Sequence, residues 1–82
     1  MFVKSQDLEN YIIEKFPYSM KIDAMEIDNI IEQATHQFGE EMSMVCNDSK
    51  WEINENAVWD YYNSEIYFKH LNDAILFRLS FV

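Results

Sequence analysis

The chain has 82 residues and a formal charge of −9, because 15 Asp and Glu outweigh six Lys and Arg. A surface this acidic repels nucleic acid and anionic membranes and attracts basic protein surfaces. With one glycine and one cysteine, the sequence excludes glycine-rich phosphate loops and intramolecular disulfides.

The first part of the chain, up to about residue 41, is predicted to form two helices. Ser5 can cap a helix from Gln6 to about Phe16, which Pro17 ends. A second helix starts near Asp23, which stands three residues before Glu26 in a variant of the capping box, and it ends at Gly39. Its apolar residues follow the spacing of one helix face: Ile27, Ile30, Ile31, Ala34 and Phe38.

The second part of the chain is predicted to form antiparallel strands. Aromatic and β-branched segments alternate with polar breaks, and the breaks recur about every 8–9 residues, which is the spacing of consecutive hairpins. An early hairpin is expected from residues 42–46 and 50–53. The breaks are Asn47-Asp48, Asn54-Glu55-Asn56, Asn63-Ser64 and Asn72-Asp73.

Two of these breaks predict the same strand register. A two-residue turn at Asn63-Ser64 would place Trp59 opposite Phe68, and one at Asn72-Asp73 would place Phe68 opposite Phe77. Both turns direct the same apolar face toward a core, and a slip of one residue in either would destroy the agreement.

The predicted fold class is therefore α+β, with two N-terminal helices packed on one face of a C-terminal antiparallel β-meander. A long helix from Glu55 to about Ser80 is the competing prediction, because Phe68, Leu71 and Ile75 also follow helical spacing. That helix would give an all-α bundle. Residues 1–82 are expected to form one small globular domain.

No pattern of residues indicates a catalytic, cofactor or metal site, so a non-enzymatic protein without a cofactor is expected. Cys46 is expected to be a small buried hydrophobic residue, and His70 is expected on the inward face of the sheet. Glu32 and His36 stand at i, i+4, which is more typical of a surface pair than of a zinc site.

The predicted partner contact lies on the helical part, where residues 1–41 carry nine carboxylates and three lysines, a net charge of −6. Carboxylates on a helix lose less entropy on binding than carboxylates on a loop. The contact is centred on Glu26, Glu32, Glu40 and Glu41, with Asp7, Glu9, Asp23 and Asp28 at its margin.

Size and charge together favour a protein-binding function. Small acidic proteins include phage inhibitors that mimic DNA, immunity proteins and antitoxins. We expect a cytoplasmic protein that inhibits or regulates a nucleic-acid-binding protein by occupying its basic surface, without binding nucleic acid or membranes itself.

Two alternatives remain open. One is an immunity protein or antitoxin that neutralises a toxin. The other is a small oligomerisation subunit, with a homodimer contact on the outer face of the sheet through Val58, Tyr62, Tyr67, Leu71 and Leu76.

Overall fold

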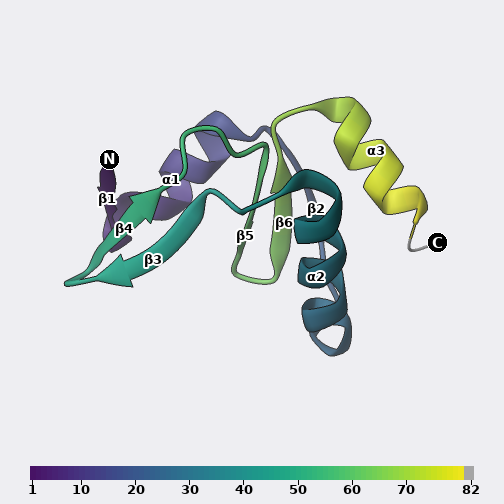
Figure 1. Cartoon of the computed structure of the whole chain (residues 1–82), viewed down its shortest axis with the longest axis horizontal. Helices are drawn as coiled ribbons and strands as arrows, with labels where there is room; N and C mark the ends of the chain where they lie inside the picture. The colour runs from purple at the N-terminus through teal and green to yellow at the C-terminus, as the bar shows by residue number, and fades with distance from the viewer. Residues whose placement is uncertain (81–82) are drawn as a thin grey trace.

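The computed structural model describes residues 1–80 and has an α+β fold, so the all-α alternative is wrong (Figure 1). One antiparallel sheet has the strand order β1-β4-β3 and consists of β1 (Phe2–Lys4), β4 (Lys50–Ile53) and β3 (Ser43–Asn47). The other has the order β2-β6-β5 and consists of β2 (Tyr18–Lys21), β6 (Glu65–Phe68) and β5 (Trp59–Tyr62). The helices are α1 (Ser5–Lys15), α2 (Ile27–Phe38) and α3 (Leu71–Leu79), and the 3₁₀ turn η1 (Ala24–Glu26) leads into α2.

Helix α1 confirms the first predicted helix to within one residue at each end. Its start differs in detail, because Lys4 occupies the N-cap position and no side chain caps the helix, whereas Ser5 was expected there. The helix ends before Pro17, and the Phe16 N–H donates to the carbonyl of Ile12 at 2.8 Å. Leu8 and Ile12, which are four residues apart and so lie on one face of the helix, are both buried.

Helix α2 confirms the second predicted helix and its end at Gly39, whereas the first predicted turn, Ala24–Glu26, is a 3₁₀ turn. The Asp23 carboxylate accepts a hydrogen bond from the Met25 N–H at 3.0 Å, so Asp23 caps the 3₁₀ turn that precedes the helix. At the other end Gly39 has a φ of 84°, a left-handed conformation that favours glycine, and its N–H donates to the carbonyl of Thr35.

The two hairpins that precede residue 69 confirm the strand prediction. Asn63 and Ser64 both have positive φ, 50° and 64°, and they place Trp59 opposite Phe68, as the turn position predicted. Strands β3 and β4 form the early hairpin, in which a positive φ occurs one residue later than expected, at Asp48 and Ser49.

The third predicted hairpin is wrong, because Asn72 and Asp73 lie in the first turn of α3 instead of in a two-residue loop. Asn and Asp are also favourable near a helix N-terminus, where main-chain N–H groups are unpaired and the dipole attracts negative charge. Phe77 still packs against Phe68, with ring centroids 5.4 Å apart, but it does so from a helix. The two residues were correctly expected in one core, and the element that carries Phe77 was not.

Strands β1 and β2 were not predicted. Each has at most four residues, and each pairs with a strand far along the chain: Val3 lies opposite Trp51, and Met20 lies opposite Ile66. Neither pairing leaves a local turn signal, because the partners are more than 40 residues apart.

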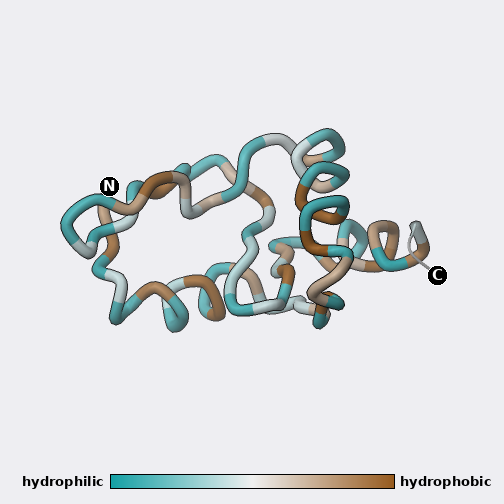
Figure 2. The backbone as a smooth tube through the Cα atoms, turned by 90° about the horizontal axis from the view of Figure 1, so that it is seen from below, coloured by the Kyte–Doolittle hydropathy of each residue, from teal (hydrophilic) through white to brown (hydrophobic). Residues whose placement is uncertain are grey.

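The β2-β6-β5 sheet separates two hydrophobic cores. Tyr67 packs with Leu8 and Ile12 of α1, whereas its neighbours Ile66 and Phe68 pack with α2 and α3. Because successive side chains of a strand point to opposite faces, α1 lies on one side of this sheet and α2 on the other. The prediction that both helices cover the same face is therefore wrong. Figure 2 shows the hydrophobic residues of α2 on the side of the helix that is turned toward the rest of the chain.

Several residues are buried where the sequence predicted exposure, or exposed where it predicted burial. Tyr67, expected on an exposed outer sheet face, is 5% exposed because α1 covers that face, and Leu71 and Leu76 of the same proposed dimer contact lie on α3. Cys46 and His70, expected inside, are exposed. Within residues 1–80, no helix has the length and apolar character needed to cross a membrane.

Candidate functional site

The negative charge is concentrated in one continuous segment, residues 22–49, which runs from the end of β2 through α2 to the β3-β4 turn. This segment carries seven of the 15 carboxylates and no Lys or Arg. It therefore contributes −7 to the formal charge of −9. The six cations all lie outside it, which leaves α2 without a positive side chain other than a protonated His36.

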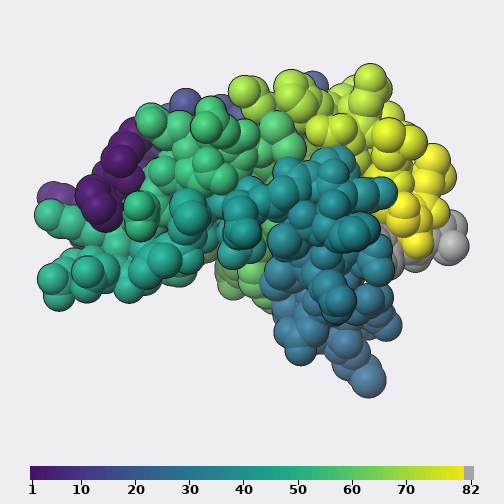
Figure 3. Space-filling view, in the orientation of Figure 1, coloured from purple at the N-terminus to yellow at the C-terminus, as the bar shows by residue number. Residues whose placement is uncertain are grey.

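Helix α2 presents its acidic residues to solvent because its apolar residues are used by the core. Ile30 and Ala34 are buried, and Asp28 and Glu32 lie one turn apart on the exposed side. Glu26 lies in η1 and Asp23 directly precedes it, so these two exposed carboxylates extend the acidic segment beyond the N-terminal end of α2. We refer to Asp23, Glu26, Asp28 and Glu32 as the acidic ridge. Figure 3 shows the segment of α2 as a projecting ridge at the front of the molecule.

The other end of α2 leads into a second group of carboxylates. The indole N–H of Trp59 donates to the carbonyl of Gly39 at 2.8 Å, and the Met42 N–H donates to the carbonyl of Trp59 at 3.0 Å. These bonds fix the chain after α2 against β5. Glu40 is exposed in this connection and Glu41 is half-buried.

A fully buried carboxylate, Asp60 of β5, lies beside this connection. The hydroxyl of Ser43 lies 2.8 and 2.9 Å from the two carboxylate oxygens of Asp60, and the Tyr61 N–H donates to one of them at 2.9 Å. Burial raises the pKa of Asp60, although these hydrogen bonds act in the opposite direction. Burial and then the charges of Asp60 and Glu40 raise the pKa of Glu41. The raised pKa values of Asp60 and Glu41 thus have burial as their main cause.

The remaining two predicted contact residues lie elsewhere. Asp7 and Glu9 are exposed on α1, on the opposite side of the β2-β6-β5 sheet from α2. The pKa of Tyr67 is raised to about 12. The causes are burial, the hydrogen bond that Tyr67 donates to Glu65, and the negative charges of Glu65 and Glu9. The structure therefore places six of the eight predicted contact residues on α2 and the segments that flank it, and leaves the two α1 residues apart.

Asp60 and its partner Ser43 were not among the predicted site residues. A charged residue inside an aromatic strand, as in Trp59-Asp60-Tyr61, is the signal that could have identified Asp60. His36 lies on the exposed side of α2, and Cys46 is exposed on β3. Among the residues that the structure describes, no three His, Cys, Asp or Glu side chains are placed to hold a metal ion.

Comparisons with protein-family models, with curated proteins and with solved structures found no match to this chain.

Proposed function

We propose that the protein is a non-enzymatic binding protein that uses the acidic ridge and Glu40 to occupy a basic surface on another protein. The supporting observation is the combination of charge and scaffold: exposed carboxylates lie along η1 and α2, within a segment that has no Lys or Arg. The chain cannot neutralise these charges from the same segment, so they are available to a cationic partner.

The scaffold makes the charges effective. Asp28 and Glu32 are four residues apart on α2, so the helix holds these two carboxylates about 6 Å apart along its axis. Carboxylates fixed in this way lose less conformational entropy on binding than carboxylates on a loop. Carboxylates can replace phosphates as partners of Lys and Arg, so the favoured partner surface is one that otherwise binds nucleic acid.

Glu41 and Asp60 add a second reason to place the contact at this side of the molecule. Burial disfavours the charged form of both groups, and the charges of Asp60 and Glu40 add to this for Glu41. A nearby cation would favour the charged form, and carboxyl groups with raised pKa values cluster at functional sites. A Lys or Arg of the partner near Glu40 and Glu41 would therefore gain more than it would beside an isolated surface carboxylate. An immunity protein or antitoxin would use the same surface, and a toxin gene next to this gene would favour that version.

The proposal is tested by capture of binding proteins from a host lysate on the immobilised chain, with and without excess DNA. Capture should weaken steeply as the salt concentration rises from about 50 to about 200 mM, and DNA should compete for the captured protein. Capture that is indifferent to both salt and DNA would contradict the proposal.

A charge-reversal pair assigns the surface. Glu26→Lys with Glu32→Lys should slow association at least about tenfold and leave the fold intact, because both side chains are exposed. The matched control reverses two exposed carboxylates outside the ridge, Glu14→Lys with Glu55→Lys, and changes the net charge by the same amount. If the control abolishes capture and the Glu26/Glu32 variant does not, the partner binds elsewhere on the protein.

A further inference from the structure

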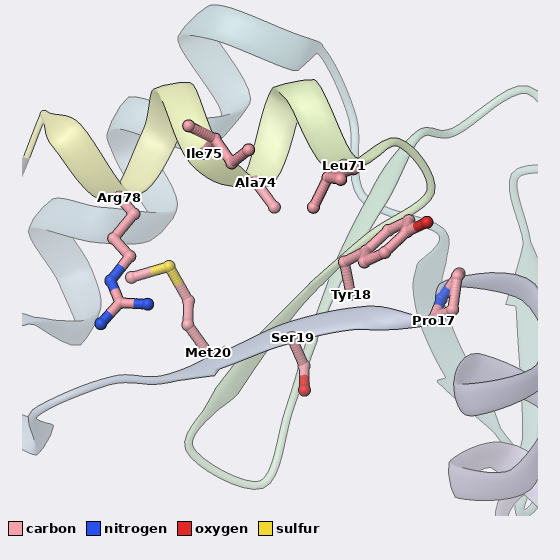
Figure 4. Close-up of a pocket in the computed structure, with 8 residues that line it drawn as sticks. All are labelled: Pro17, Tyr18, Ser19, Met20, Leu71, Ala74, Ile75 and Arg78. Carbon is pink, nitrogen blue, oxygen red and sulfur yellow. The ribbon is translucent and has the colours of Figure 1, made fainter.

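An apolar groove separates strand β2 from helix α3 (Figure 4). Tyr18 and Met20 form one wall, Leu71 and Ile75 form the other, and Arg78 lies at the end near Met20. Its volume is about 340 Å³. The groove lies outside the acidic ridge and involves none of its residues, so it requires a separate explanation.

The strand that borders the groove has an open edge. In the order β2-β6-β5, β2 is an edge strand. The Ile22 N–H donates to the carbonyl of Ser64 at 2.9 Å, which fixes the alternation of the ladder: Met20 and Tyr18 exchange main-chain hydrogen bonds with β6. The N–H and C=O groups of Ser19 and Lys21 therefore point away from β6. Within residues 1–80, no strand pairs with them.

The helix that borders the groove has apolar side chains on nearly all sides. Only Phe77 is buried among the described residues of α3, whereas Leu71, Ile75, Leu76 and Leu79 are between 48% and 66% exposed. A helix that is apolar on all sides is typical of one that is covered on more than one side. Leu71 and Ile75 present an apolar surface beside the open edge of β2, so both surfaces can be covered by the same ligand.

The charge of the groove distinguishes between possible occupants. Arg78 is the single charged residue among those that line it, and Lys21 lies on the adjacent strand edge, in a chain that is otherwise acidic. A second copy paired through β2 would bring another Lys21 and another Arg78, and the β2 sequence Tyr-Ser-Met-Lys supplies no carboxylate. A helical ligand could fill the groove but could not bond to the main chain of Ser19 and Lys21, because its own main-chain groups are already paired.

We propose that this groove binds an extended peptide segment of a partner protein, which adds a strand to the free edge of β2. Main-chain bonds to Ser19 and Lys21 hold the peptide, and its alternate side chains are apolar and enter the groove between β2 and α3. A carboxylate of the peptide meets the guanidinium of Arg78. The chain would then engage partners through two surfaces of opposite character.

The test uses a displayed library of random linear peptides, selected on the full chain. The counter-selection uses Ile75→Glu, which places a charge in the groove at a residue that is 48% exposed in the free protein. The matched control is Leu76→Glu, a more exposed residue of the same helix that does not line the groove. Circular dichroism of both variants checks that the fold is retained.

Selected peptides should carry apolar residues at alternate positions and an Asp or Glu at one end. For a synthetic fluorescent version of such a peptide, Ile75→Glu should weaken binding at least about tenfold, and Leu76→Glu by less than about threefold. Arg78→Glu should weaken binding, and exchanging the acidic peptide residue for Lys should restore it.

The extended mode has its own signature. Methylation of every second peptide N–H should abolish binding, whereas methylation of the intervening N–H groups should have little effect, because only one set faces β2. Equal sensitivity at both sets would overturn the proposal, and so would a failure to enrich any peptide on the wild-type chain over Ile75→Glu. A wild-type dimer that Ile75→Glu dissociates would also overturn it, because the second copy would then occupy the groove.

Discussion

Replacement of Phe77 by Ala tests whether α3 is held to the protein by one side chain. Phe77 is fully buried, and its ring centroid lies 5.4 Å from that of Phe68 and 5.9 Å from that of Phe38. If every element stayed in place, the cavity would cost about 3–5 kcal/mol. Helix α3 can instead detach, because its other large apolar side chains are about half exposed or more.

Because α3 can detach, the loss in free energy of unfolding caused by Phe77→Ala is limited. Full burial of a phenylalanine contributes about 1.5–3 kcal/mol, and the exposed residues of α3 add little to its docking. We therefore expect Phe77→Ala to lower the free energy of unfolding by about 2–3 kcal/mol and to release α3. Phe68 lies in the central strand of its sheet, and this strand cannot detach without breaking the sheet. Phe68→Ala should therefore lower the free energy of unfolding by about 3–5 kcal/mol.

Amide hydrogen exchange with urea denaturation distinguishes the two cases. In Phe77→Ala the amides of α3 should lose most of their protection while those of β5 and β6 keep most of theirs; in Phe68→Ala all should lose protection together. Leu79→Ala, at a residue that is 66% exposed, is the control and should change stability by less than about 0.5 kcal/mol. Equal loss of protection in α3 and β6 of Phe77→Ala would refute the reasoning, since α3 would then unfold only with the whole protein.

Two further predictions concern the buried carboxylate and a strained turn. Burial raises the pKa of Asp60 and of Glu41 above their unfolded values, so the folded state binds their protons more tightly than the unfolded state does. The stability that results is lost as the pH rises through the folded pKa values. Asp60→Asn should therefore gain stability relative to the wild type as the pH rises above about 4, measured by urea midpoints; parallel pH profiles would contradict this. Ser64→Gly should raise the thermal midpoint by the equivalent of about 0.4–1 kcal/mol, because Ser64 has a φ of 64° that glycine adopts without strain. Ser80→Gly, at a residue with a φ of −70°, should bring no such gain.

The sequence alone determined the elements whose signals are local. The segment formed by η1 and α2 has a cap at Asp23, an apolar face and a glycine at its end, all within 17 residues. The position of α2 and its exposed acidic side could therefore be predicted from local signals. The turn at Asn63-Ser64 sets the register of β5 and β6 for the same reason, because a two-residue turn determines which residues face each other. The acidic part of the candidate site was therefore predictable.

Only the tertiary structure decided what depends on distant partners. Residues 71–79 satisfy both a helical and a strand pattern, and packing on β2 and β6 selects the helix. The short strands β1 and β2 exist because β4 and β6 offer them an edge, and no neighbouring residue specifies that pairing. The burial of Asp60 also depends on distant segments. Strand alternation shows on which face of β5 the side chain lies, but only the packing of α1 and the β1-β4-β3 sheet covers that face. Local free energies set the propensities of these segments, and the burial of apolar surface against distant segments decided between them.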